Sequence, residues 1–225
     1  MRCRAFSAAR GGCLGSLARV PREIVYHPAM RNACAFLLAG GQSSRMGHDK
    51  AFLEFQGSTL LNRALAVARE AAGEVRIVGS PQKFQGFAPT VEDQFSGCGP
   101  LAGIHSALSS STFEYNLVLA VDMPFLEAKF LGYLLEQARI SNGLVTLPRT
   151  EHGWQPLCAV YRREFAPMAE SALRGGRYRI NHLFCDLELR VINERELSQH
   201  GFSPEMFRNL NTPEEFERAS LVKKN

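Results

Sequence analysis

The chain has 225 residues, of which 45% are hydrophobic and 21% charged, and its formal net charge is +4 at pH 7. This length suits one large α/β domain or two small ones. The sequence contains no run of about eighteen apolar residues, so no membrane span is predicted. The surplus positive charge lies in residues 1–30, and the remainder is balanced, which argues against a basic nucleic-acid-binding protein.

The first 29 residues are rich in Arg, Ser and Gly and nearly free of acids. They are compatible with a transit peptide or with a true start at Met30, just before the first apolar run. We favour the second interpretation, and predict a disordered or non-native extension over 1–29 and a single domain over 30–221. Six scattered cysteines without a Cys-x-x-Cys pair predict reduced thiols and a cytoplasmic protein.

Apolar runs and helical patterns alternate along the chain. Strands are predicted at 34–38, 52–55, 75–79, 88–93, 115–121, 144–148, 154–161 and 190–192, and helices at 60–68, from 104, at 127–140 and at 162–173. This alternation predicts an α/β fold: a single doubly wound, mostly parallel sheet with a small antiparallel C-terminal extension. Open sheets of this kind bind ligands where the strands end.

The loop over residues 38–50 follows the first strand. Its glycines let the backbone approach a ligand closely, and its N–H groups can cradle phosphate oxygens. Arg45 and Lys50 add two positive charges, one a planar fork and the other a point charge. A plain turn needs neither cation, so the loop predicts a polyphosphate site. The P-loop and the dinucleotide fingerprint are both absent from it.

Two later segments follow strands in the same way. A second glycine loop at Gly99–Gly103 leads into a helix start, where backbone groups can form the floor of a nucleotide site. Asp122 stands where the clearest buried strand stops and is followed by Met123 and Pro124. It is either a ligand of a divalent metal ion or the N-cap of the next helix. The cationic loop upstream favours the metal.

These motifs together resemble a known family. The pattern Leu-Ala-Gly-Gly-x-Ser-x-Arg-Met-Gly-x-Asp-Lys resembles the signature of nucleotidyltransferases that activate small phosphates with an NTP. Its Gly-Gly pair and its Asp-Lys pair are most similar to the molybdenum cofactor guanylyltransferases, the molybdopterin-guanine dinucleotide synthase family of the nucleotidyltransferase superfamily. The matching segments are residues 38–50, 99–104, 122–124, 155–161 and 209–215. One departure is Gly79-Ser80-Pro81, where many relatives carry an Asn.

The resemblance implies that GTP and the molybdopterin form of the cofactor are joined into the guanine dinucleotide, with Mg²⁺ held by Asp122. It implies catalytic roles for Arg45, Lys50 and Asp122. It also implies nucleotide contacts from Leu38, Ala39, Gly40, Gly41, Ser43, Lys50, Asp93, Gly99, Pro100, Leu101 and Asp122. Acceptor contacts are expected from Gln155, Arg177, Asn209 and Asn211. Arg177 could instead belong to a solvated basic loop, and the two asparagines could satisfy a turn.

The expected partners are GTP and the molybdopterin cofactor, with molybdoenzymes or their chaperones as recipients, and neither nucleic acid nor a membrane. Two alternatives stay open. One is a related cytidylyl- or sugar-phosphate nucleotidyltransferase. The other is a non-catalytic nucleotide- or cofactor-binding chaperone on the same fold, because fold alone does not define activity.

Overall fold

A mixed eight-stranded sheet forms the centre of the molecule. The computed structural model describes residues 32–40, 49–210, 215–216 and 219, so the predicted extension over 1–29 lies outside the described residues. The strand order is β5-β4-β1-β6-β9-β7-β10, with β8 paired to β7. Their bounds are β1 Ala33–Leu38, β4 Glu74–Val78, β5 Thr90–Val91, β6 Tyr115–Ala120, β7 Val145–Thr150, β8 Gly153–Trp154, β9 Cys158–Arg162 and β10 Leu189–Asn193.

The sheet is mostly parallel, as predicted. β1 pairs in parallel with both β4 and β6, and β10 pairs in parallel with β7. Two strands run antiparallel to their neighbours: β9, which lies inside the sheet between β6 and β7, and the short β8 on β7. The strand in the last sixty residues, expected to be antiparallel, is therefore parallel, and the reversal comes earlier in the chain.

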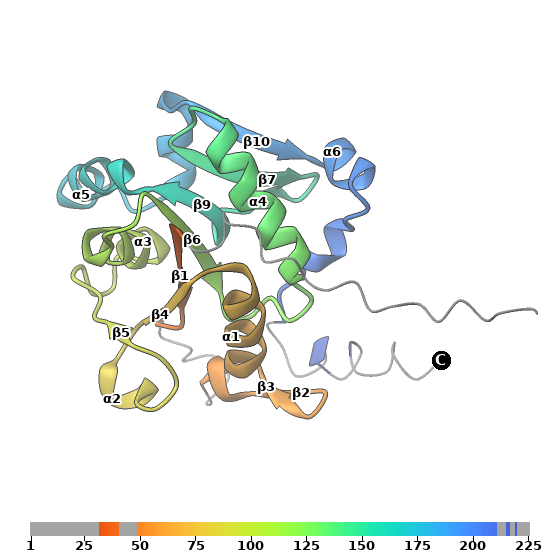
Figure 1. The fold of residues 1–225 in the computed structure, drawn as a ribbon. Coiled ribbons are helices and arrows are strands. Elements are labelled where there is room, and N and C mark those ends of the chain that lie inside the picture. The colour runs from red at the N-terminus through yellow and green to blue at the C-terminus, as the bar shows by residue number, and fades with distance from the viewer. Residues whose placement is uncertain (1–31, 41–48, 211–214, 217–218, 220–225) are drawn as a thin grey trace, which may run out of the picture.

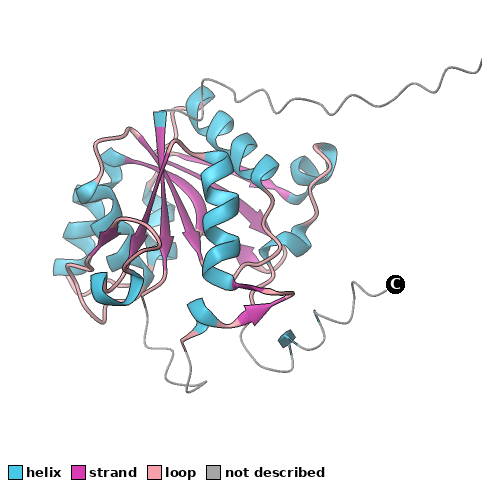
Figure 2. Cartoon of the chain, turned by 60° about the horizontal axis from the view of Figure 1, so that its bottom comes forward, coloured by secondary structure: helices cyan, strands magenta, loops and turns pink. Residues whose placement is uncertain are grey.

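Helices cover both faces of the sheet (Figures 1 and 2). α1 (Leu60–Ala71) and α4 (Ala128–Ile140) pack on one face, and α3 (Pro100–Ser110) and α5 (Ala166–Arg174) pack on the other. Shorter elements are α2 (Pro81–Phe84), α6 (Glu194–Gln199), the 3-10 turns η2 (Lys50–Phe52), η3 (Arg163–Phe165), η4 (Ile180–Asp186) and η5 (Pro204–Phe207), and a hairpin of β2 (Glu54–Phe55) with β3 (Ser58–Thr59). Among the described residues, none of the helices is both long and apolar enough to cross a bilayer.

The central strand explains why the two layers form. In β1, Ala35 and Leu37 enter the core under α1 and α4, whereas Cys34 and Phe36 enter the opposite core with Ala107 of α3. Successive strand residues point to opposite faces, so a strand covered on both sides is apolar throughout. This is why its sequence shows a continuous apolar run.

Several boundaries differ from the predicted ones. Helix α3 begins at Pro100, not near residue 104, because Gly99 adopts φ 73° and Pro100 occupies the first turn. Gly103 is therefore a helix residue, where an added Cβ would lie 3.2 Å from the Leu38 side chain. The predicted strands at 52–55 and 154–161 are each interrupted: the first by η2, the second by the turn between β8 and β9.

Candidate active site

The carboxyl ends of the parallel strands β1, β4, β5 and β6 lie side by side along one end of the sheet, which we call the ligand edge. In register, Leu38 stands beside Val78 on one side and Ala120 on the other. Beyond the ladder, Ala39 N and Gly40 N both donate to Val78 O at 3.1 Å. The backbone of residues 38–40 is thereby fixed against β4 at the edge where ligands of open sheets bind.

Gly79 continues β4 at this edge and permits a close approach. Its N–H donates to Val91 O at 2.9 Å, which joins the end of β5 to the same group. A Cβ on Gly79 would lie 2.6 Å from the Phe84 ring, so a larger residue would force that buried ring aside. The glycine at this position thus accommodates Phe84.

Lys50 and Asp122 come together here from distant parts of the chain. Lys50 Nζ lies 3.7 Å from Asp122 Oδ2, and the side chains are 25% and 20% exposed. Lys50 is the first residue of η2, whereas Asp122 follows the end of β6. A cation and a carboxylate therefore share one partly buried place at the predicted ligand edge.

The electrostatics of Asp122 reflect this setting. Burial raises the pKa of its carboxyl group, and the Lys50 charge opposes that effect without cancelling it. The alternative role as a helix N-cap is wrong, because α4 begins at Ala128 with Glu127 as its N-cap. The carboxylate is therefore available to a ligand at this edge.

A divalent ion could be held here by few protein ligands. Within the part of the chain that the structure describes, no three His, Cys, Asp or Glu side chains gather as a metal site. Mg²⁺ characteristically uses one or two carboxylates and completes its shell with water and substrate phosphates. A single partly buried carboxylate at a strand end, beside a lysine, fits that mode.

Asp93 is held in place from helix α3. Its Oδ1 accepts a hydrogen bond from Phe95 N at 3.1 Å and lies 3.3 Å from Ser106 Oγ. The buried Ser106 hydroxyl also accepts from Gln94 N at 2.9 Å. The loop after β5 is thus fastened to α3, beside the exposed Gly99 and Pro100. The neighbouring Leu101 is fully buried, backbone included.

The segments expected to face the acceptor reach the same edge by different routes. Ala120 N donates to Leu157 O at 2.8 Å, and this antiparallel continuation brings Gln155 alongside the end of β6. Gln155 Nε2 donates to Thr150 Oγ1 at 3.4 Å. Leu210 N donates to Asp122 O at 3.1 Å, so the exposed Asn209 stands next to the candidate metal residue.

Arg177 lies in the exposed loop after α5. Its N–H donates to Ala172 O at 2.8 Å, and the Arg174 guanidinium, at the end of α5, lies 5.8 Å from the centre of the Phe95 ring. The end of α5 is therefore beside the loop that follows β5. Four predicted site residues, Gly41, Ser43, Arg45 and Asn211, lie outside the described residues.

Two contributors were not singled out from the sequence. Ser106 lies within an ordinary helical pattern, and Lys83 in the short segment after β4. The ε-ammonium group of Lys83 forms an ion pair with Asp49, the residue before Lys50. Neither partnership has a local signal, because each joins residues from different elements.

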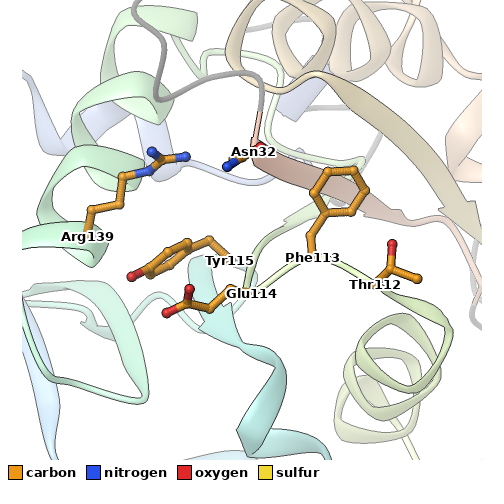
Figure 3. Close-up of a pocket in the computed structure, with 6 residues that line it drawn as sticks. All are labelled: Asn32, Thr112, Phe113, Glu114, Tyr115 and Arg139. Carbon is orange, nitrogen blue, oxygen red and sulfur yellow. The ribbon is translucent and has the colours of Figure 1, made fainter.

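A separate cavity of about 580 Å³ lies at the opposite edge of the sheet (Figure 3). It is lined by Asn32, Thr112, Phe113, Glu114, Tyr115 and Arg139, which adjoin the starts of β1 and β6 and the end of α4. Because Lys50 and Asp122 adjoin the opposite end of the parallel strands, this cavity is not part of the candidate site.

The chain is similar to several known proteins. Residues 35–185 match the model of the MobA-like NTP transferase domain. A probable molybdenum cofactor guanylyltransferase of Pelotomaculum thermopropionicum is 32% identical over 198 residues, covering 87% of this chain and 96% of the relative. The molybdenum cofactor guanylyltransferase of Desulfosudis oleivorans is 34% identical over 192 residues, covering 83% and 93%.

Solved structures share the architecture. The crystal structure of molybdopterin-guanine dinucleotide biosynthesis protein A from Archaeoglobus fulgidus superposes with a TM-score of 0.74 at 25% identity, covering 84% of this chain and 97% of that one. A 2-C-methyl-D-erythritol 4-phosphate cytidylyltransferase from Thermus thermophilus, at 17% identity and a TM-score of 0.61, shares the fold alone. The chain therefore belongs to the MobA-like NTP transferase domain family and is an enzyme of the nucleotidyltransferase class.

Proposed function

We propose that this enzyme transfers GMP from GTP to the phosphate of molybdenum-molybdopterin and releases pyrophosphate. The observation that carries the proposal is the Lys50–Asp122 pair, 3.7 Å apart at the ligand edge of the sheet. The proposed acceptor, molybdenum-molybdopterin, and the proposed nucleobase, guanine, are taken from the names of the relatives. Molybdoenzymes or their chaperones would receive the product.

The reaction is an in-line displacement. An oxygen of the acceptor phosphate bonds to the α-phosphorus of GTP, and the bond to the bridging oxygen of the leaving pyrophosphate breaks. The attacking phosphate is already ionised, so the step needs positioning and charge neutralisation more than a strong general base. A direct displacement of this kind forms no covalent enzyme intermediate.

Each part of the site has a role in this scheme. The N–H groups of Ala39 and Gly40 donate to Val78 O and fix the entry of the loop after β1. The later backbone N–H groups of that loop, with Gly41 and Ser43, hold phosphate oxygens. Lys50 and Arg45 stabilise the charge that develops on the transferring and leaving phosphates. Mg²⁺ held by Asp122 would act as a Lewis acid and a template for the phosphates.

The two substrates are recognised on either side of Asp122. Asp93, which lies beside Ser106, can accept hydrogen bonds from the guanine N1–H and 2-amino groups or from ribose hydroxyls. The second glycine loop, from Gly99 to Leu101 at the start of α3, forms one wall of the nucleotide site. Gln155, Asn209 and Asn211 are assigned to the acceptor on the other side. Arg177 is assigned to the acceptor as well, but it follows the end of α5, which lies beside the loop after β5 on the nucleotide side.

The first test is pyrophosphate release by the purified protein with GTP, Mg²⁺ and molybdenum-molybdopterin. Asp122→Ala should lower the rate by about a hundredfold or more, because one well-placed electrostatic contact contributes that much to catalysis. Asp186→Ala, which removes an exposed aspartate from η4, is the control and should retain the wild-type rate. A wild-type protein that releases no pyrophosphate would refute the proposal.

A nucleotide panel separates the related transferases. Preference for CTP would assign the enzyme to cytidylyl transfer, and turnover with a sugar phosphate would replace the acceptor. Calorimetry of GTP with and without Mg²⁺ tests the non-catalytic alternative. GTP binding that is indifferent to the metal, in a protein without turnover, would favour a nucleotide-binding chaperone.

A further inference from the structure

The ammonium group of Lys83 contacts two aromatic rings and a carboxylate. Its Nζ lies 4.8 Å from the centre of the Phe84 ring and 5.9 Å from that of Phe52, and the two rings stack on each other. The ammonium group pairs with Asp49, with side chains 31% and 29% exposed. Burial lowers the pKa of Lys83. Several contacts from different elements therefore fix one side chain of α2.

Asp49 is occupied by two partners. Its Oδ1 accepts from Ala51 N at 3.1 Å and so caps the turn η2, while its Oδ2 faces Lys83. Both oxygens are thereby engaged within the protein. Although Asp49 lies next to Lys50, its carboxylate serves as a connector and not as a second metal ligand.

The turn that Asp49 caps begins with Lys50. The chain of contacts runs from Lys83 through Asp49 to η2, and from Lys50 Nζ to Asp122 Oδ2 at 3.7 Å. η2 has only three residues, and a turn of that length has little stability of its own. Its orientation must come from its cap and from the groups that hold that cap.

We propose that Lys83 is a positioning residue that acts through Asp49 to place the Lys50 ammonium group over the triphosphate of the nucleotide. This inference rests on the proposed function, because it assumes that Lys50 contacts phosphates. Lys83 itself touches no substrate in this arrangement. Its positive charge also balances Asp49, which would otherwise weaken the positive field that Lys50 presents to an anion.

Lys83→Met tests the proposal, because methionine keeps the apolar stem of the side chain over the rings and removes the charge. We expect kcat/KM for GTP to fall about tenfold, since small misplacements of a catalytic group cost one to two orders of magnitude. Lys83→Arg, which keeps the charge, should recover most of the loss. The matched control is Lys129→Met on α4, whose Nζ also lies over a ring, 5.8 Å from Phe202. It should leave kcat/KM unchanged.

A double-mutant cycle distinguishes positioning from direct contact. In a Lys50→Met background, Lys83→Met should change kcat/KM by less than about twofold, because the group that Lys83 positions is gone. Asp49→Asn should resemble Lys83→Met, and the two together should be no worse than either alone. Losses that multiply with that of Lys50→Met would overturn the proposal, as would an unaltered rate in Lys83→Met.

A second readout does not require turnover. Calorimetry with inorganic tripolyphosphate and Mg²⁺ should show weaker binding for Lys83→Met than for Lys129→Met, with equal unfolding temperatures for the two variants. If the wild type binds tripolyphosphate but transfers no GMP, the proposed function fails while this inference is still tested. Equal tripolyphosphate affinities in the two variants would refute the inference alone.

Discussion

Single contacts define the candidate site at the scale of residues. Lys50 and Asp122 could be expected to meet, because each follows a strand whose carboxyl end lies at the same edge. Ser106 and Lys83 could not, because their partners Asp93 and Asp49 are reached only through packing of α3 and α2. Sequence patterns report the type and order of the elements, but not which side chain of a helix meets which loop.

Ser106 offers a prediction at this scale. Ser106→Ala removes the acceptor of the Gln94 N–H and the hydroxyl beside Asp93, so the free energy of unfolding should fall by about 1–3 kcal/mol. Because Asp93 is assigned to the nucleoside, KM for GTP should rise more than kcat falls. Thermal unfolding and steady-state kinetics measure the two effects.

The control for this variant lies on the same helix. Ser110→Ala loses a hydroxyl that donates to Ala107 O at 2.8 Å, away from Asp93. It should leave KM for GTP unchanged. Equal KM values for GTP in the two variants would show that Ser106 does not contribute to nucleotide binding.

Secondary-structure elements were easier to identify than their ends. The buried strands β1 and β6 and the amphipathic helices α1 and α4 follow from apolar periodicity. Thr59 caps α1 as its sequence predicts, with its Oγ1 accepting from Asn62 N at 3.2 Å. The start of α3 was placed too late, because a Gly-Pro-x-x-Gly segment is typical of a loop. Burial of Gly103 against Leu38 stabilises the helix there instead.

One ion-pair network joins the elements β10, α6 and α4. Arg190 of β10 donates to Glu196 of α6 from both terminal nitrogens, and Tyr133 of α4 donates to Glu196 Oε1 at 2.6 Å. Burial alone would raise the pKa of Glu196, but the hydrogen bonds from Arg190 and Tyr133 outweigh it and lower that pKa below its ordinary value of 4.5. Burial and the same contact raise the pKa of Tyr133 to about 12.

The network predicts a pH-dependent stability. A lowered carboxyl pKa contributes stability that is present above pH 4.5 and is lost as the pH falls through the folded-state value. Glu196→Gln should therefore lower the free energy of unfolding by about 1–3 kcal/mol at neutral pH. Below pH 4.5, the difference in this free energy between the variant and the wild type should become smaller. Urea unfolding at a series of pH values measures this.

An exposed pair is the control for the network. Glu170→Gln breaks the surface contact with Arg174, whose side chain is 69% exposed, and should have a much smaller effect. An equal loss in both variants would show that burial of the network is unimportant. A difference from the wild type that persists unchanged in acid would contradict the pH argument.

At the scale of the whole molecule, the α/β class, the mostly parallel sheet and the family were all predictable from alternating patterns and from the loop motif. The position of β9 was not, because an antiparallel strand buried on both faces reads like a parallel one. Only pairing with β6 and β7 fixes its direction. Its placement matters for the site, since the reversal delivers Gln155 to the ligand edge.

The extent of the domain leads to a prediction about its start. We expect residues 1–29 to lie outside the domain, and the first strand, β1, begins at Ala33, after Met30. A chain that begins at Met30 should therefore unfold within about 2 °C of the full-length protein, since a loss of 1 kcal/mol would lower the unfolding temperature by about 2–4 °C. Pyrophosphate release should be equal in both. A clear loss of either would show that residues 1–29 belong to the domain.

The register of β1 also affects how the chain can assemble during synthesis. Its partner β6 is translated roughly eighty residues later, so one backbone edge of this apolar strand stays unpaired on the ribosome for several seconds at ordinary rates of elongation. The unpaired N–H and C=O groups of an apolar strand are a template for association with other nascent chains. The strand that precedes the nucleotide loop in the finished enzyme is thus also a segment that needs shielding while the protein is being made.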